Sequence, residues 1–240
     1  MRIGKHAGLG ILALVTLVYG IVYFVVQANL TAVSAALAEQ PVKVILDAGH
    51  GGEDGGAVSA SGCKESDINL QIALRLEQLL ALLGAEPHMI RTQDVSVYTG
   101  SCDTLTEKKV SDLKNRVKTV NAVTPAILVS IHQNHFSSQA YSGAQVFYGK
   151  TTGSSELADC MQQSLRQGLD PNNKRDIKRA EHVYLMEHAA CPAILVECGF
   201  LSHPQEALLL QQDIYQTKLV CAIAQGVVQY LEKGESSGEV

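Results

Sequence analysis

The chain alternates short apolar segments with longer segments in which apolar residues recur at helical spacing. A short apolar run that ends in glycine or polar residues is typical of a buried strand, whereas apolar residues three or four positions apart indicate an amphipathic helix. The predicted strands are 44–48, 86–91, 126–131, 143–148 and 192–196, and the predicted helices are 66–83, 106–122, 154–169 and 214–230. Strands that alternate with helices in this way predict an α/β fold with a central sheet.

The first predicted helix has recognisable ends. Ser66 and Asp67 are suitable N-cap residues, and Gly84 follows the last apolar position, where it can end the helix. The apolar positions at helical spacing are Ile68, Ile72, Leu76, Leu79 and Leu83. We expect these residues to form the buried face of the helix.

The first 38 residues differ in character from the rest of the chain. Three basic residues, Arg2, Lys5 and His6, precede an uncharged apolar stretch over 7–26. A stretch of this length can cross a bilayer, and basic residues at one end keep that end inside the cell. We therefore expect 1–38 to be an uncleaved single-pass membrane anchor, with the remaining chain outside the cytoplasm. Signal-peptide cleavage after Ala38, followed by secretion, is the alternative.

The remaining chain has the size of one ordinary domain, which we expect to span 39–233. The polar tail at 234–240 is expected to be disordered. The formal net charge of −5 argues against a nucleic-acid-binding protein. The six cysteines permit disulfides in an exported domain but do not fix their pairing.

Four candidate chemical residues lie next to the predicted strands and the first helix. His50 follows the first strand in a glycine-rich loop, and His132 follows the strand over 126–131. Glu197 follows the strand over 192–196, and Glu65 precedes the first helix. Open α/β sheets bind ligands at the carboxyl ends of their strands. The four side chains are therefore expected at one edge of the sheet.

Two histidines and a carboxylate are a ligand set of catalytic zinc, which keeps three protein ligands and leaves a fourth position to water. A further carboxylate can then act as general base. The spacing is not the compact helical motif of thermolysin-like enzymes, so structural alternatives stay open. For the histidines these are a loop residue at His50 and a buried, hydrogen-bonded imidazole at His132. For the glutamates, the alternatives are that Glu65 only caps or solvates the start of the helix and that Glu197 forms an ion pair with an arginine.

Four short segments surround these residues: DAGHGG at 47–52, the pair Lys64 and Glu65, SIHQN at 130–134 and VECGFLS at 196–202. In this order they resemble the zinc-dependent N-acetylmuramoyl-L-alanine amidases. The similarity runs from about Val42 to about Tyr230, and its further segments resemble the germination-specific members found in spore-forming bacteria. The chain departs from the usual family sequence at four positions, none of them a predicted ligand: Ala48, Gln133, His135 and His203.

The resemblance implies that three side chains bind Zn²⁺, those of His50, Glu65 and His132. It implies that Glu197 is the catalytic base and later the proton donor. The reaction would hydrolyse the amide between N-acetylmuramic acid and the L-alanine of the stem peptide in peptidoglycan. In the germination-specific members this cut precedes muramic-δ-lactam formation in spore cortex. The implied fold is a twisted, mostly parallel six-stranded sheet flanked by helices, and the sequence identifies no accessory protein.

Other polar residues near these segments have two interpretations each. Asn134 is expected to bind substrate or to orient a ligand, and Arg91 to bind a stem-peptide carboxylate or to form an ion pair. Asp47 is a candidate hydrogen-bond acceptor for a ligand histidine. Cys63 and Cys198 are either small buried residues or further thiolate ligands.

Two other function classes fit the same residues. A zinc peptidase that acts on a peptide cross-link would release shortened peptides, whereas an amidase would release whole stem peptides. A membrane-anchored wall-binding protein would bind peptidoglycan without turnover. Metal content and the effect of Glu197→Gln distinguish this last class from an enzyme.

Overall fold

The computed structural model describes residues 14–24 and 43–237. The chain divides after Gln40 into two units, which are described separately. In the first unit, residues 14–24 are helical; the rest of the predicted membrane segment and the cleavage site after Ala38 lie outside the described residues. Within the described ranges, none of the helices combines the length and the hydrophobicity that a bilayer span requires.

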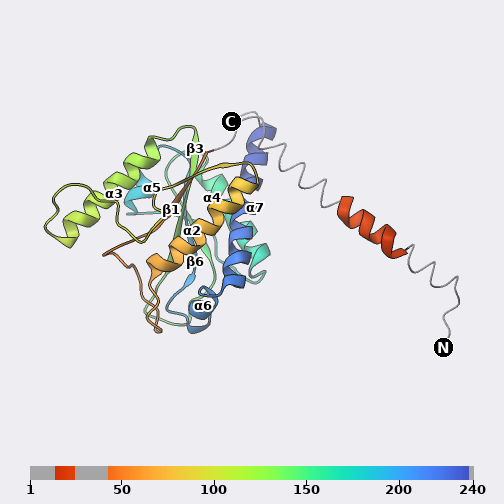
Figure 1. The fold of residues 1–240 in the computed structure, drawn as a ribbon, viewed down its shortest axis with the longest axis horizontal. Helices are drawn as coiled ribbons and strands as arrows, with labels where there is room; N and C mark the ends of the chain where they lie inside the picture. The colour runs from red at the N-terminus through yellow and green to blue at the C-terminus, as the bar shows by residue number, and fades with distance from the viewer. Residues whose placement is uncertain (1–13, 25–42, 238–240) are drawn as a thin grey trace. The chain divides into compact units, whose positions relative to one another are not determined.

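The second unit contains all the strands and helices expected from the sequence (Figure 1). Its strands are β1 (Lys43–Ala48), β2 (Glu86–Met89), β3 (Ala126–Asn134), β4 (Gln145–Tyr148), β5 (Lys178–Arg179) and β6 (Ala193–Phe200). Its helices are α2 (Glu65–Leu82), α3 (Leu105–Asn121), α4 (Ser154–Gly168), α5 (Tyr184–His188), α6 (Pro204–Leu209) and α7 (Asp213–Ser237). The three elements that the sequence did not predict, β5, α5 and α6, are too short to show a periodic pattern.

The six strands form one sheet in the order β2-β1-β3-β6-β4-β5. β1 pairs in parallel with both β2 and β3, and β3 pairs in parallel with β6. β4 is antiparallel to β6 and parallel to β5. The sheet is therefore six-stranded and mixed, with its one antiparallel pairing between β6 and β4.

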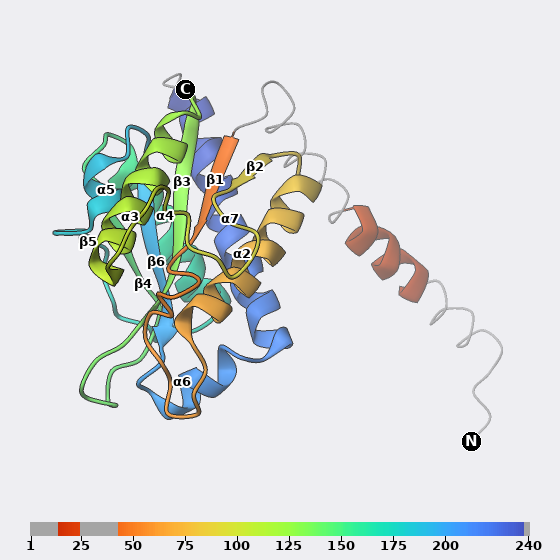
Figure 2. The ribbon, with the colours of Figure 1, turned by 60° about the vertical axis from the view of Figure 1, so that its left-hand side comes forward.

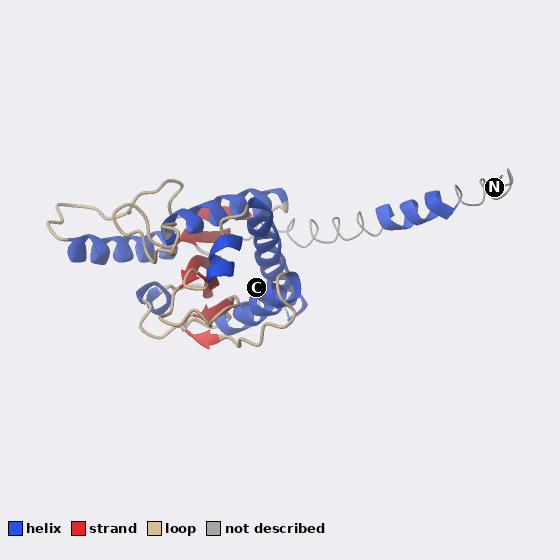
Figure 3. Ribbon diagram, turned by 90° about the horizontal axis from the view of Figure 1, so that it is seen from below, coloured by secondary structure: helices blue, strands red, loops and turns tan. Residues whose placement is uncertain are grey.

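Helices cover both faces of this sheet (Figure 2 and Figure 3). α2, α4 and α7 pack together against one face, and α3 and α5 pair on the other. On the α3 and α5 face the core joins Val120 and Leu185 of the helices to Ile45, Leu128 and Leu195 of the strands. Alternate strand residues share a face. Residues two or four positions after Leu128 on β3, and two positions after Leu195 on β6, therefore also lie on this face.

α2 begins one residue earlier than predicted, and its N-cap is Lys64, without a side-chain hydrogen bond. The prediction of Ser66 and Asp67 as caps is wrong because backbone carbonyls satisfy the first N–H groups of the helix. The Glu65 amide donates to the Ala57 carbonyl at 2.8 Å, and the Ser66 amide donates to the Gly55 carbonyl at 3.1 Å. The loop after β1 thus folds back onto the helix start.

Two other predictions need correction. Leu80, rather than Leu79 or Leu83, completes the fully buried stripe of α2. At the C-terminus, α7 continues to Ser237, into the segment that was expected to be disordered. Residues 238–240 of that segment lie outside the described residues.

Candidate metal centre

The loop after β1 brings His50 to the C-terminal edge of the sheet. His50, Gly51 and Gly52 all have positive φ angles, of 61°, 136° and 61°, a region that non-glycine residues seldom adopt. A Cβ atom on Gly49 would lie 2.2 Å from the ring of His132, and one on Gly56 would lie 2.6 Å from the Glu65 carboxylate. The glycines of this loop are therefore needed to let the predicted ligands approach one another.

Three side chains converge at this point: His50, Glu65 and His132. Oε1 of Glu65 lies 3.3 Å from Nε2 of His50 and 2.9 Å from Nδ1 of His132. The possible ligand atoms of the three residues all lie within 4.8 Å of one another. Residues far apart in the sequence thus supply two nitrogens and one oxygen to a single point.

His50 is oriented by Asp54. Nδ1 of His50 lies 3.0 Å from Oδ2 of Asp54, which leaves Nε2 directed towards Glu65. Burial alone would lower the pKa of His50, but the hydrogen bonds to Asp54 and Glu65 raise it to about 9. Asp54, and not Asp47 as the sequence suggested, is the carboxylate that pairs with a histidine of this group.

The carboxylate of Glu65 is buried and fully engaged. Its Oε1 accepts hydrogen bonds from the backbone N–H of Gln133 at 3.1 Å and from Asn69 Nδ2 at 3.3 Å. Its Oε2 accepts one from the backbone N–H of Ala57 at 2.9 Å. Burial alone would raise the pKa of Glu65, but the adjacent histidines lower it well below its usual range. Glu65 is therefore held ionised, as a metal ligand must be.

Glu197 stands beside this group on β6. The parallel register pairs it with His132 on β3, so both side chains lie on the α3 and α5 face. Within the described part of the chain, its Oε2 is buried without a hydrogen-bond partner. Burial raises the pKa of Glu197 to about 7, although the nearby imidazole of His132 opposes the shift. A buried carboxyl group of this kind is costly unless it has a function, and a pKa near 7 suits a group that accepts and returns a proton.

A buried ion pair supports the centre from the side of α3. Arg116 Nη1 donates to Asp47, and Ser130 Oγ donates to the other Asp47 oxygen at 2.6 Å. Arg116 Nη2 donates to the backbone carbonyl of His50 at 2.7 Å. Burial would raise the pKa of Asp47, but the Arg116 charge lowers it. Local sequence patterns could not identify the role of Arg116, because its partner on β1 lies 69 positions away.

Arg91 occupies a different place from the one expected for a substrate contact. Its buried guanidinium donates to backbone carbonyls of the loop and of α2: Ala48 at 2.8 Å, Gly49 at 3.0 Å and Ser66 at 2.9 Å. A fourth hydrogen bond goes to the carbonyl of Gln93. Four of the five N–H groups of a guanidinium are thus used within the fold. Arg91 thus holds the loop that follows β1, called the metal loop below, through contacts with carbonyls rather than an ion pair. Its substrate-binding role stays a prediction.

The other candidate residues lie around the centre without joining it. Asn134 is partly buried at the end of β3, where its carbonyl accepts from Leu201 N at 2.8 Å, and its substrate-binding role stays a prediction. Among the described residues, the cluster that could hold a metal includes neither cysteine nor His135. All six cysteines are free, and Cys198 is a buried residue of the core.

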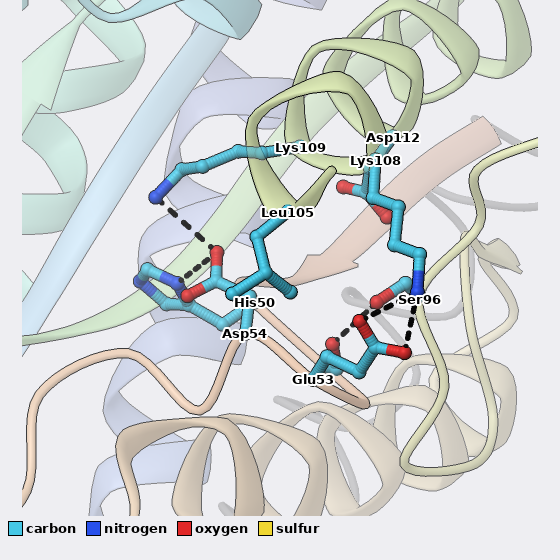
Figure 4. A pocket seen from close by; sticks show the side chains of 9 residues that line it. His50, Glu53, Asp54, Ser96, Leu105, Lys108, Lys109 and Asp112 are labelled. Carbon is cyan, nitrogen blue, oxygen red and sulfur yellow. Dashed lines mark hydrogen bonds and ion pairs between the residues drawn. The ribbon is translucent and has the colours of Figure 1, made fainter. Parts of the chain in front are cut away.

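A pocket adjoins His50 on the side of α3 (Figure 4). Two lysines of α3 reach into it, and each faces an acidic residue of the metal loop. Lys108 Nζ lies 2.7 Å from Glu53, and Lys109 Nζ lies 3.4 Å from Asp54. This charged pocket connects the N-terminal part of α3 with the carboxylate that orients His50.

The converging side chains fit a zinc ion. The separations of 2.9 and 3.3 Å around Glu65 Oε1 approach the roughly 3.3 Å between ligand atoms that tetrahedral zinc coordination implies. The donor set of two imidazoles and one carboxylate is one that catalytic zinc uses. Asp54 also supplies the outer carboxylate that metal-bound histidines usually have.

Comparison with known proteins agrees with this site. A family model described as N-acetylmuramoyl-L-alanine amidase (Amidase_3) matches residues 44–229. A germination-specific N-acetylmuramoyl-L-alanine amidase of Bacillus subtilis (strain 168) is 39% identical over 194 residues, which cover 80% of this chain and 81% of that protein.

Solved structures show the same similarity. The CwlD amidase from Clostridioides difficile, in complex with the GerS lipoprotein, has a TM-score of 0.77 and 38% identity over 80% of this chain and 99% of that chain. An N-acetylmuramoyl-L-alanine amidase from Clostridium difficile 630 has a TM-score of 0.70 and 32% identity over 80% of this chain and 97% of that chain. The chain therefore belongs to the N-acetylmuramoyl-L-alanine amidases of the Amidase_3 family, a family of metal-dependent hydrolases.

Proposed function

We propose that this amidase depends on zinc held by His50, Glu65 and His132, with Glu197 as the catalytic base. The observation that carries the proposal is the convergence of these three ligand atoms beside Glu197, whose Oε2 is buried with no hydrogen-bond partner among the described residues. A zinc ion in such a site supplies Lewis acidity, which makes water a nucleophile near neutral pH. The amide attacked is the one between N-acetylmuramic acid and L-alanine.

The chain's own residues would divide the work as follows. Glu197 accepts the proton of the attacking water and then donates it to the departing amine of L-alanine. Asp54 fixes the ring of His50, and the hydrogen bonds to Glu65 fix its carboxylate. Because each ligand is held before substrate arrives, little reorganisation is needed in the transition state.

Analysis of the digestion products tests this function against a peptidase. We expect the zinc-loaded protein, incubated with peptidoglycan, to release whole stem peptides that begin at L-alanine and to leave the glycan intact. Mass spectrometry identifies these fragments, and treatment with a chelator followed by zinc should abolish and restore their release. Shortened peptides would instead indicate a peptidase, and zinc binding without any release would favour a wall-binding protein.

Zinc affinity is expected to depend on pH through His50. The pKa of His50 is raised to about 9 without metal, and a ligand nitrogen must lose its proton before it binds. Below about pH 9, each unit of acidification should therefore weaken zinc binding about tenfold. Asp54→Asn removes one of the groups that raise this pKa and should flatten the dependence. Competition with a chelator between about pH 7 and pH 9 measures the slope; a flat profile for the unmodified protein would contradict the prediction.

We further propose that the enzyme acts on spore-cortex peptidoglycan, where its cut precedes muramic-δ-lactam formation. The germination-specific relative of Bacillus subtilis supports this setting. The basic and apolar residues before residue 39 support a catalytic domain outside the cytoplasm, anchored or secreted. The Clostridioides difficile structure contains a lipoprotein partner, which supports the proposal that an accessory protein also acts with this chain.

A further inference from the structure

The loop between β3 and β4 presents two exposed aromatic side chains. Phe136 is 51% exposed and Tyr141 is 48% exposed, and their rings meet edge to face with centroids 4.9 Å apart. Tyr141 also stacks on Phe200 at 6.4 Å, and the Arg175 guanidinium lies 4.6 Å from the centre of the Phe200 ring. These four residues are called the aromatic patch below.

The loop that carries the patch is fixed at its base. The Phe136 amide donates to Ser202 Oγ at 3.1 Å, and the Gly143 amide donates to the Glu206 carboxylate at 2.8 Å. Arg175 Nε donates to the Ser142 carbonyl at 2.7 Å. The fold therefore holds both exposed rings in place at the surface.

The patch lies close to the reacting centre. Phe136 follows His132 by four positions along an extended chain, so it is at most roughly 13 Å away. Phe200 follows Glu197 on β6, at the same edge of the sheet. In Figure 2 the loops after β1 and β3 extend from this same end of the sheet.

Sheet order places the patch and the charged pocket on opposite sides of the centre. The patch residues come from β6 and from the segments that lead into β4 and β5, whereas the charged pocket lies between the loop after β1 and α3. In the sheet, β3, which carries His132, lies between β1 and β6. A substrate bound across the centre would therefore have one half on each surface.

The two halves of the amidase substrate match these two surfaces. The glycan half presents uncharged sugar rings with apolar faces, which stack on aromatic side chains; the stem peptide carries charged groups, which suit a pocket of lysines and carboxylates. We propose that Phe136 and Tyr141 form a sugar-binding subsite for the glycan strand, and that the stem peptide extends towards α3. This inference rests on the proposed function and adds the direction in which substrate lies.

Glycan binding by the full-length protein tests the subsite. The probes are peptide-free strands of N-acetylglucosamine and N-acetylmuramic acid, and free stem peptide, each titrated by calorimetry. The double variant Phe136→Ala/Tyr141→Ala should bind the strands about tenfold more weakly, with its stem-peptide affinity retained. Tyr141→Phe keeps the ring and should bind the strands normally. Leu82→Ala is the control for removing an exposed apolar side chain away from the patch, since Leu82 is 81% exposed at the end of α2; it should also bind normally.

Thermal unfolding of each variant shows whether it is folded. Unchanged strand affinity in the double alanine variant would overturn the inference, as would an absence of strand binding by the unmodified protein. Loss of stem-peptide binding in place of strand binding would reverse the proposed direction. Stem-peptide release by the unmodified protein reports separately on the amidase function. If release fails while strand binding still depends on the two rings, the function is wrong and the subsite stands.

Discussion

Glu197→Gln is expected to lower kcat at least about 100-fold, with bound zinc retained. Glutamine has nearly the same shape as glutamate but cannot accept the proton of water or return it to the leaving amine. The side chain is not among the three converging ligand residues, so zinc stoichiometry should not change. Stem-peptide release under saturating substrate measures kcat, and elemental analysis of the same samples measures zinc.

The matched control is Glu156→Gln, an exposed position at the start of α4, which should leave both quantities unchanged. Turnover at the original rate in Glu197→Gln would contradict the role of general base. Loss of zinc together with activity would instead make Glu197 part of the metal site. Glu197→Asp keeps the acid but shortens it and should retain a fraction of the activity.

Arg116→Met is expected to cost about 3–5 kcal/mol of unfolding free energy, because it leaves the Asp47 charge buried without its partner. This is a large share of the roughly 5–15 kcal/mol by which domains are stable. The variant also loses the hydrogen bonds to the carbonyls of Ala48 and His50, so zinc affinity should fall as well. Denaturant unfolding of the metal-free protein separates the stability effect from the zinc effect.

A chemically matched substitution is available at the surface. Arg75 pairs with Asp213 at 2.5 Å, with side chains that are 39% and 84% exposed, and Arg75→Met should cost no more than about 1 kcal/mol. Equal costs for the two arginines would contradict the special role of the buried pair. Adding Asp47→Leu to Arg116→Met should recover part of the lost stability, since the more deeply buried of the two carboxylates that pair with Arg116, Asp47 rather than Asp112, is then no longer left unpaired.

Short-range patterns were sufficient for all the strands except β5, for the long helices and for the candidate residues. β1, β3 and β6 are runs of buried residues, and such runs are visible in one dimension because sheets covered on both faces need continuous apolar strands. The same patterns placed His50 in a glycine loop and His132 and Glu197 beside the strands. His132 lies within β3 and Glu197 within β6, rather than after these strands as predicted, because the ends of strands are poorly marked in sequence.

The contacts that surround the metal centre could not be predicted in the same way. Asp54 is only four residues from His50, yet it pairs with the ring because the loop turns back through residues with positive φ. Arg91 carries a charge that could bind a substrate carboxylate, but the tertiary structure buries it against four backbone carbonyls. No local pattern marked Phe136 and Tyr141, which the fold exposes side by side.

The sequence by itself determined the α/β class, the main elements, the family resemblance and the four residues of the centre, because these depend on local periodicity and on short motifs. Tertiary structure alone decided the mixed sheet, the partners of Asp47, Asp54 and Arg91, and the placement of the aromatic patch opposite the charged pocket. Those features depend on strand order and on contacts between segments far apart in the chain. The energies that fix them arise only when such segments are packed together.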